Sequence, residues 1–199
     1  MSSSSSKSRV DRVREYVERF VSEKFPSGIY YHNIEHTYDV VKGCRIIGED
    51  CNVSKREMEM LEAAAWLHDI GYYAGFENHE AVGASLAQDF LLKNGWTQEE
   101  VEIINNCILS TKVPQKPKTL LEEIICDADL FHLATEKFFE KSDLLWQEFV
   151  LYDKNLTKEQ WKINSRKFVE SQKYFTAYGK KHLEPKLKQN IEKLTKGTF

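Results

Sequence analysis

Apolar residues recur every three or four positions along most of the chain, which is the spacing that lines one face of an α-helix. In residues 9–25, Val10, Val13 and Val17 share one face, and charged side chains occupy the opposite face. The same spacing predicts further helices over about 33–49, 54–69, 78–94, 97–110, 119–133, 144–151, 157–178 and 180–194. No segment shows the strict alternation that is typical of a strand. We therefore predict an all-α fold.

Helix starts are marked by capping boxes, in which Ser or Thr is followed three residues later by Glu or Gln. Each of four such pairs stands directly before a segment with helical spacing: Ser54/Glu57, Thr97/Glu100, Thr119/Glu122 and Thr157/Gln160. Asn33 and Asn78 predict two more N-caps, because asparagine side chains accept hydrogen bonds from the first amides of a helix. Gly71 predicts a helix that ends in the left-handed conformation.

The chain shows no internal repeat and no linker rich in Gly or Ser between the predicted helices. We therefore predict a single domain over residues 8–195. Residues 1–7 contain the serine tract from Ser2 to Ser6, which has too few apolar side chains to order itself. We predict that residues 1–7 form a disordered tail.

Composition and charge narrow the classes of function. The 199 residues are 41% hydrophobic and 30% charged, a balance typical of globular proteins. The net charge of −3 gives no basic footprint for a nucleic-acid polymer, and no apolar run approaches the ~20 residues of a membrane span. Four cysteines without a C-x-x-C pair, and the lack of a signal-peptide pattern, favour reduced thiols in a cytoplasmic protein.

Four residues stand out as candidates for chemistry: His36, the adjacent His68 and Asp69, and Asp129. His36 falls in the first turn of a predicted helix, and the His68–Asp69 pair in the last turn of another. Asp129 lies inside a strongly apolar predicted helix, where a carboxylate is costly unless a partner compensates its charge. A bound cation would compensate it, and two imidazoles with two carboxylates suit Fe, Mn, Co, Ni or Zn. The alternative is that His36, His68 and Asp69 are ordinary polar groups at capped helix ends, and that Asp129 is a buried carboxylate hydrogen-bonded to a turn.

Four motifs carry a resemblance to a known family: Tyr31-His32-Asn33-Ile34-Glu35-His36-Thr37, Trp66-Leu67-His68-Asp69-Ile70-Gly71-Tyr72, Asn78-His79-Glu80 and Cys126-Asp127-Ala128-Asp129-Leu130. In order and spacing they resemble the HD-domain superfamily of metal-dependent phosphohydrolases. The resemblance implies an HD-domain helical bundle in which His36, His68, Asp69 and Asp129 hold a divalent metal ion (Mn, Fe, Co, Ni, Zn or Mg). It also implies hydrolysis of a phosphomonoester or phosphodiester, often a nucleotide or cyclic nucleotide. Asp127 is the alternative last ligand; the Ala-Asp-Leu surroundings favour Asp129.

The resemblance also bears on the number of metal ions. His79 matches a histidine that supplies a second metal in some members, which carry another histidine near the end of the following helix. That neighbourhood, residues 107–112, contains no histidine here. We therefore predict one metal ion, which also counts against the di-iron oxygenase branch of the fold.

Three residues are catalytic candidates. Asp69 is one because it is a ligand of the predicted metal ion. His79 could contact phosphate or transfer a proton, or it could be a solvated residue at a helix start. Lys112 could meet a phosphate as a point charge, or it could be a solvated loop lysine.

The leading hypothesis is thus a phosphohydrolase that acts on a small phosphate ester, with a nucleotide as the expected partner. Two alternatives stay open: a module that binds a nucleotide without turnover, and a helical interaction protein whose histidines and acids are structural. The apolar residues of the final helices could form a homodimer interface or close the bundle.

Overall fold

The computed structural model of the chain describes residues 7–196. The predicted tail, apart from Lys7, lies outside the described residues. The helices are α1 (Arg9–Lys24), α2 (Ile34–Asp50), α3 (Lys55–Leu67), η1 (Ile70–Ala74), α4 (His79–Lys93), α5 (Gln98–Ser110), α6 (Leu120–Asp129), η2 (Phe131–Ala134), α7 (Phe138–Tyr152), α8 (Lys158–Ser171), η3 (Gly179–Leu183) and α9 (Glu184–Thr195). The described residues include no strand, so the all-α prediction is confirmed.

The N-cap predictions largely match the structure. Ser54 and Thr97 form complete capping boxes with Glu57 and Glu100 at the starts of α3 and α5. Asn33 caps α2, where its side-chain oxygen accepts hydrogen bonds from the amides of Glu35 and His36. This cap begins α2 at a point that places His36 in the first turn.

Two local predictions are wrong. Gly71 lies inside the 3₁₀ helix η1 and is not among the residues with positive φ; the left-handed glycine of this segment is Gly75, at φ 128°. Asn78 precedes α4 in a left-handed conformation, but its side chain makes no capping bond. Its Oδ1 instead accepts a hydrogen bond from Lys112 Nζ at 3.0 Å. In both cases a contact between distant segments decided a conformation that the local sequence left open.

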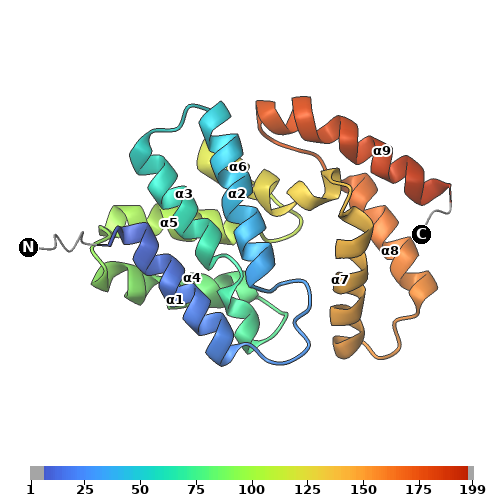
Figure 1. Cartoon of the computed structure of the whole chain (residues 1–199), viewed down its shortest axis with the longest axis horizontal. Helices are drawn as coiled ribbons and strands as arrows, with labels where there is room; N and C mark the ends of the chain where they lie inside the picture. The colour runs from blue at the N-terminus through green and yellow to red at the C-terminus, as the bar shows by residue number, and fades with distance from the viewer. Residues whose placement is uncertain (1–6, 197–199) are drawn as a thin grey trace, which may run out of the picture.

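Two hydrophobic clusters hold the chain together. The larger is built from α1 to α6, where α2 packs against both α3 and α6. The smaller joins η2 to α7, α8, η3 and α9, and Leu183 and Leu187 are buried in it. Figure 1 shows α7, α8 and α9 gathered on one side of the first six helices. These leucines therefore help to close the bundle, and a homodimer stays a prediction. No helix of residues 7–196 combines the length and hydropathy needed to cross a bilayer.

The C-terminal boundaries differ from the predicted ones. The segment predicted as one helix over 119–133 divides into α6 and η2, and α8 ends at Ser171 rather than near Tyr178. A buried carboxylate explains the second difference. Asp127 of α6 accepts hydrogen bonds from the backbone amides of Phe175 and Thr176, at 2.8 and 2.9 Å, and from the Thr176 hydroxyl at 2.7 Å. These bonds hold the extended segment after α8 against α6.

Glu100 gives a prediction for stability in acid. The side chain is 4% exposed and lies 2.8 Å from Arg9 and 3.2 Å from Arg56. Burial alone would raise its pKa, but the Thr97 amide and the two arginines lower it to about 2. A lowered pKa in the folded state stabilises the protein above pH ~4.5, and this contribution is lost as pH falls toward 2.

We expect Glu100→Gln to lower the free energy of unfolding by about 2–3 kcal/mol at pH 7. Near pH 2 the difference from the parent protein should vanish. Urea unfolding at a series of pH values measures both quantities. A variant whose stability ran parallel to that of the parent protein between pH 7 and pH 2 would contradict the assignment.

Candidate metal centre

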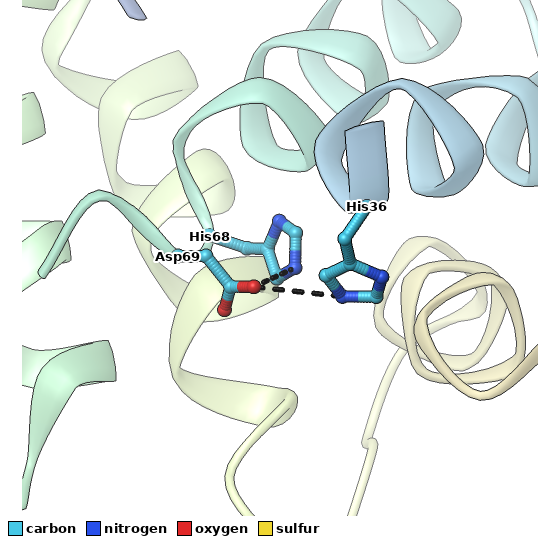
Figure 2. A group of neighbouring side chains, drawn as sticks. All are labelled: His36, His68 and Asp69. Atoms are coloured by element: carbon cyan, nitrogen blue, oxygen red, sulfur yellow. Dashed lines mark ion pairs between the residues drawn. The ribbon is translucent and has the colours of Figure 1, made fainter. Parts of the chain in front are cut away.

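The candidate ligands come from the ends of three helices. His36 lies in the first turn of α2, His68 and Asp69 lie between α3 and η1, and Asp129 is the last residue of α6. Helix ends suit this purpose because the chain changes direction there, so neighbouring side chains such as His68 and Asp69 can face the same point. Figure 2 shows the side chains of His36, His68 and Asp69 turned toward one another.

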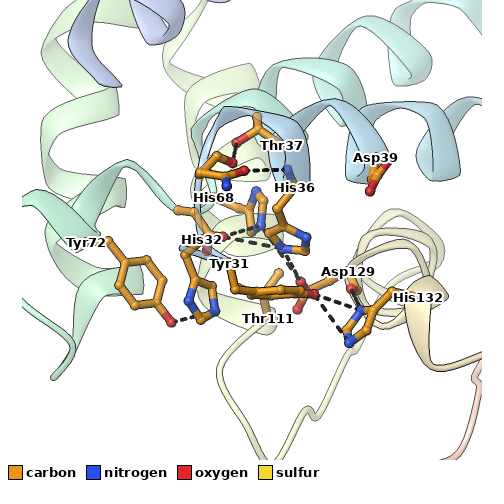
Figure 3. Close-up of polar contacts among 12 residues, drawn as sticks. Tyr31, His32, His36, Thr37, Asp39, His68, Tyr72, Thr111, Asp129 and His132 are labelled. Atoms are coloured by element: carbon orange, nitrogen blue, oxygen red, sulfur yellow. Dashed lines mark hydrogen bonds and ion pairs between the residues drawn. The ribbon is translucent and has the colours of Figure 1, made fainter. Parts of the chain in front are cut away.

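The four side chains converge in the structure. Asp69 Oδ2 lies 3.0 Å from His68 Nε2 and 3.5 Å from His36 Nε2. Asp129 Oδ1 lies 3.2 Å from His36 Nε2 and 3.8 Å from His68 Nε2, as Figure 3 shows for His36. Ligand atoms of His36, His68 and Asp69 all lie within 4.8 Å of one another. The predicted set therefore meets at one place, although its members are up to 93 residues apart.

Unpartnered polar atoms show that this place fits a cation. His68 Nε2 and Asp69 Oδ2 are fully enclosed, yet neither has a hydrogen-bond partner of good geometry among the described residues. The other ring nitrogen of His68, Nδ1, lies 2.8 Å from the carbonyl oxygen of Ala65. A bond from Nδ1–H to that carbonyl leaves the lone pair of Nε2 facing the cluster, as in many metal-binding histidines. The group can thus hold a divalent metal ion.

The electrostatics of the cluster agree with this interpretation. Burial alone would lower the pKa of His68, but the carboxylates of Asp69 and Asp129 raise it to about 9. The same histidines hold the pKa of both carboxylates below the ordinary value, against the effect of burial. The carboxylates are therefore ionised near neutral pH, which is the form that binds a metal ion. A metal ion would take the place of the proton on His68.

Asp127, the alternative ligand, lies away from the cluster. Its carboxylate is directed at the segment after α8, where it accepts three hydrogen bonds. Burial raises its pKa, and these hydrogen bonds oppose the rise. The structure therefore brings Asp129, and not Asp127, to the other three residues.

His79 and Lys112 occupy different positions relative to the cluster. His79, at the start of α4, has Nε2 3.7 Å from Asp69 Oδ1, and its ring stacks on Tyr72 at 3.9 Å. It therefore lies beside the candidate metal ligands. Lys112 is exposed and is held by Asn78, so the structure does not bring it into the cluster.

Glu148 is a residue of this region that no sequence pattern singles out. It is fully buried on α7, and its carboxylate accepts hydrogen bonds from the amides of Tyr31 and His32 at 2.7 and 3.1 Å. Its other oxygen lies 2.6 Å from His32 Nδ1, while His32 Nε2 lies 3.0 Å from the Tyr72 hydroxyl. His32 therefore belongs to a buried carboxylate–imidazole pair. No local signal marks Glu148, which lies 116 residues from His32.

His132 is a second residue of this region that is not among the predicted site residues. It lies next to Asp129 in Figure 3, where Nδ1 is 2.8 Å from the Tyr31 hydroxyl and 3.2 Å from the Asp129 carbonyl oxygen. Burial lowers its pKa to about 3, so the ring is neutral at physiological pH. Its position three residues after Asp129 is the signal that could have found it.

A cavity of about 340 Å³ opens beside the cluster. Asp69, Asp129, His32 and His79 line one part of it, and side chains of α7 and α8 line another. Most of the lining side chains are aromatic or aliphatic. This combination of an apolar cavity and a few convergent polar groups is typical of a small-molecule site.

Comparison with known proteins gives two findings. The HD domain family matches residues 33–134, which include all four candidate ligands. Among solved structures, the chain is similar to a predicted HD superfamily hydrolase from an uncultured Thermotogales bacterium, with a TM-score of 0.63 and 17% sequence identity over 94% of this chain and 90% of that chain. At that identity the likeness concerns the fold. Comparison with curated protein sequences gave no match.

Proposed function

This chain belongs to the HD-domain superfamily, and we propose that it is a metal-dependent phosphohydrolase of small phosphate esters. The substrate class that we propose is a phosphomonoester or phosphodiester of a nucleotide or cyclic nucleotide. The observation that carries the proposal is an enclosed cluster: His68 Nε2 and Asp69 Oδ2 make no hydrogen bond of good geometry and lie with His36 and Asp129 beside the cavity.

Each of these residues has a defined part in the proposed reaction. His36, His68, Asp69 and Asp129 would hold the ion, and Asn33 fixes the helix end from which His36 projects. A divalent ion held there would supply a water acidified toward neutral pH and a positive charge for a phosphoryl oxygen.

The Glu148–His32 pair supports the proposal because His32 lines the same part of the cavity as the candidate ligands. The Glu148 carboxylate is hydrogen-bonded to Nδ1 of the His32 ring. His32 Nε2 is therefore the nitrogen that can contact a ligand, which would replace the Tyr72 hydroxyl as its partner. We assign to His32 Nε2 the transfer of a proton to the leaving oxygen, and Glu148 is its positioning residue. His79 borders the same cavity and would contact the phosphoryl group.

The direct test measures hydrolysis of phosphomonoesters, phosphodiesters and cyclic nucleotides with added Mn²⁺, Co²⁺, Ni²⁺ or Mg²⁺. We expect activity that requires a divalent ion and that falls at least about 1000-fold in Asp69→Ala, which loses a ligand and a negative charge from the site. The matched control is Asp89→Ala, because Asp89 is exposed on α4. Equal activity of Asp69→Ala and the parent protein would exclude the proposal. A nucleotide that raises the melting temperature but is never hydrolysed would favour the binding module.

Glu148→Gln tests the positioning role. A glutamine has no negative charge and would turn its NH₂ group toward either His32 Nδ1 or the backbone amides, so we expect kcat to fall about 10- to 100-fold. The bound metal content should stay at the level of the parent protein, since Glu148 contacts none of the four ligands. Glu140→Gln, at an exposed position on the same helix, serves as the control. An unchanged pH profile and kcat in Glu148→Gln would contradict the role.

A further inference from the structure

One wall of the cavity is a continuous series of aromatic rings. Tyr72, which contacts His32, lies 5.6 Å from Phe76 between ring centroids. Phe76 lies 4.6 Å from Phe149 of α7, and Phe149 lies 5.2 Å from Trp161 of α8. All four residues line the cavity. The wall therefore runs from the candidate metal centre to α8.

Two polar atoms without partners lie at the α8 end of this wall. Trp161 is 8% exposed and Ser165 is 9% exposed, and both residues line the cavity. Trp161 Nε1 and Ser165 Oγ are enclosed and have no hydrogen-bond partner among the described residues. A buried donor without a partner is costly, and the indole N–H of a buried tryptophan usually has one. A small rotation of either side chain toward the cavity would let a ligand atom accept its hydrogen bond.

The charges along the cavity restrict the anionic part of a ligand. No Lys or Arg of residues 7–196 is among the lining residues, whereas Asp69, Asp129 and Glu80 are. Two lysines near the site are already engaged, Lys112 by Asn78 and Lys141 by Asp39 at 3.1 Å. Additional phosphates beyond the one at the metal centre would find acidic or apolar side chains in place of cationic partners. A single phosphate is therefore favoured over a polyphosphate.

We propose that Trp161 and Ser165 determine substrate specificity by binding a planar aromatic heterocycle joined to a single phosphate group. This inference rests on the proposed function, because the phosphate would lie at the metal centre. The aromatic wall stacks against the plane of the ring, and the indole N–H and the serine hydroxyl bind heteroatoms at its edge. A pure hydrocarbon would leave both polar groups without partners, and a sugar phosphate would leave the wall uncovered.

The experiment separates binding of the heterocycle from hydrolysis. Binding is measured by titration calorimetry with adenosine, guanosine, cytidine and uridine, which carry no phosphate and need no reaction. Hydrolysis is measured with the four nucleoside monophosphates, ribose 5-phosphate and the four triphosphates. We expect at least one nucleoside to bind, and its monophosphate to have a kcat/KM at least tenfold above those of ribose 5-phosphate and the triphosphate. If no nucleoside binds, or if ribose 5-phosphate reacts as fast as every monophosphate, the inference is wrong.

Two variants locate the binding to α8. Trp161→Phe removes the N–H and keeps an aromatic ring, and Ser165→Ala removes the hydroxyl. We expect each to weaken nucleoside binding about 3- to 10-fold, and to lower kcat/KM for the nucleoside monophosphate by a larger factor than kcat/KM for ribose 5-phosphate. Trp146→Phe is the matched control. The ring centroids of Trp146 and Trp161 lie 6.2 Å apart, but Trp146 does not line the cavity.

The outcomes distinguish this inference from the proposed function. Trp161→Phe could weaken nucleoside binding while the parent protein hydrolyses no ester. That result would support the binding role of α8 and overturn the phosphohydrolase. If Trp161→Phe and Ser165→Ala hydrolyse the nucleoside monophosphate as fast as the parent protein does, the phosphohydrolase is supported and the role of α8 is overturned. Equal effects of Trp161→Phe and Trp146→Phe would also overturn it.

Discussion

Asp129→Asn should lose metal binding and hydrolysis while the protein stays folded. Asp129 lies 3.2 Å from His36 Nε2 and 3.8 Å from His68 Nε2, and an amide replaces a charged ligand with a neutral one. We expect the affinity for a divalent ion to fall at least about 100-fold and kcat/KM at least about 1000-fold. The melting temperature without added metal should fall only modestly, because the two histidines that lower the pKa of Asp129 lose one of their two partner carboxylates. Titration with Mn²⁺ or Co²⁺ and thermal melting measure the two effects.

Asp127→Asn is the matched comparison, with the opposite pattern expected. Asp127 is buried, and all three of its hydrogen-bond partners are donors: the amides of Phe175 and Thr176 and the Thr176 hydroxyl. An asparagine would present its own NH₂ group to one of these donors. We expect a loss of about 2–4 kcal/mol in stability, with normal metal affinity in the fraction that remains folded. If Asp127→Asn loses the metal and Asp129→Asn retains it, the assignment of the last ligand is wrong.

The four side chains that the sequence predicted to meet do so in the structure, and the positions of most of them depend on local sequence. Asn33 caps a helix, and this alone places His36 in the first turn. His68 and Asp69 follow α3 directly, and Asp129 ends α6. The choice between Asp127 and Asp129 rested on resemblance alone, because both fall in the same apolar segment. In the structure the two carboxylates face different groups. Asp127 faces the segment after α8, and Asp129 faces His36 and His68.

The sequence could not predict the features that depend on α7 and α8. Glu148 meets His32 only because α7 folds back beside the start of α2, and nothing in the spacing of α7 distinguishes it from a solvated glutamate. Trp161 fits the apolar periodicity of α8 like any core residue, so its unpartnered N–H is visible only once the cavity is known. Both residues lie outside the part of the chain that matches the HD domain family, residues 33–134. The candidate metal ligands could thus be predicted from the sequence, whereas Glu148 and Trp161 could not.

Gly71 shows why a glycine can be misinterpreted from sequence. A glycine after a helical segment predicts either a left-handed turn or a close approach of two backbones, and the local sequence does not decide between them. At Gly71 the second reason applies. A Cβ there would overlap the carbonyl oxygen of His79 and would lie 2.8 Å from the backbone nitrogen of Gly83. The absence of a side chain at residue 71 therefore allows α4 to pack directly on η1.

This close approach predicts that Gly71→Ala will destabilise the protein strongly. Because the atoms in the way belong to the backbone, α4 must shift as a whole, and we expect a loss of about 3–5 kcal/mol in the free energy of unfolding. The same shift would move His79 away from Asp69, so hydrolysis should fall even in the folded fraction. Urea unfolding gives the first quantity, and kcat/KM at a temperature well below the melting point gives the second.

Gly83→Ala provides the control from the other side of the same contact. A Cβ at Gly83 would have its nearest neighbours, Gly71 N and Leu67 O, at 3.4 Å, which is ordinary contact distance. Alanine also favours the helix by roughly 1 kcal/mol over glycine, so the stability of this variant should lie within about 1 kcal/mol of the parent protein. If both substitutions had equal effects, the contact between η1 and α4 would not be what requires glycine at residue 71. A large effect of Gly71→Ala alone would show that this backbone contact holds the cavity wall that carries His79.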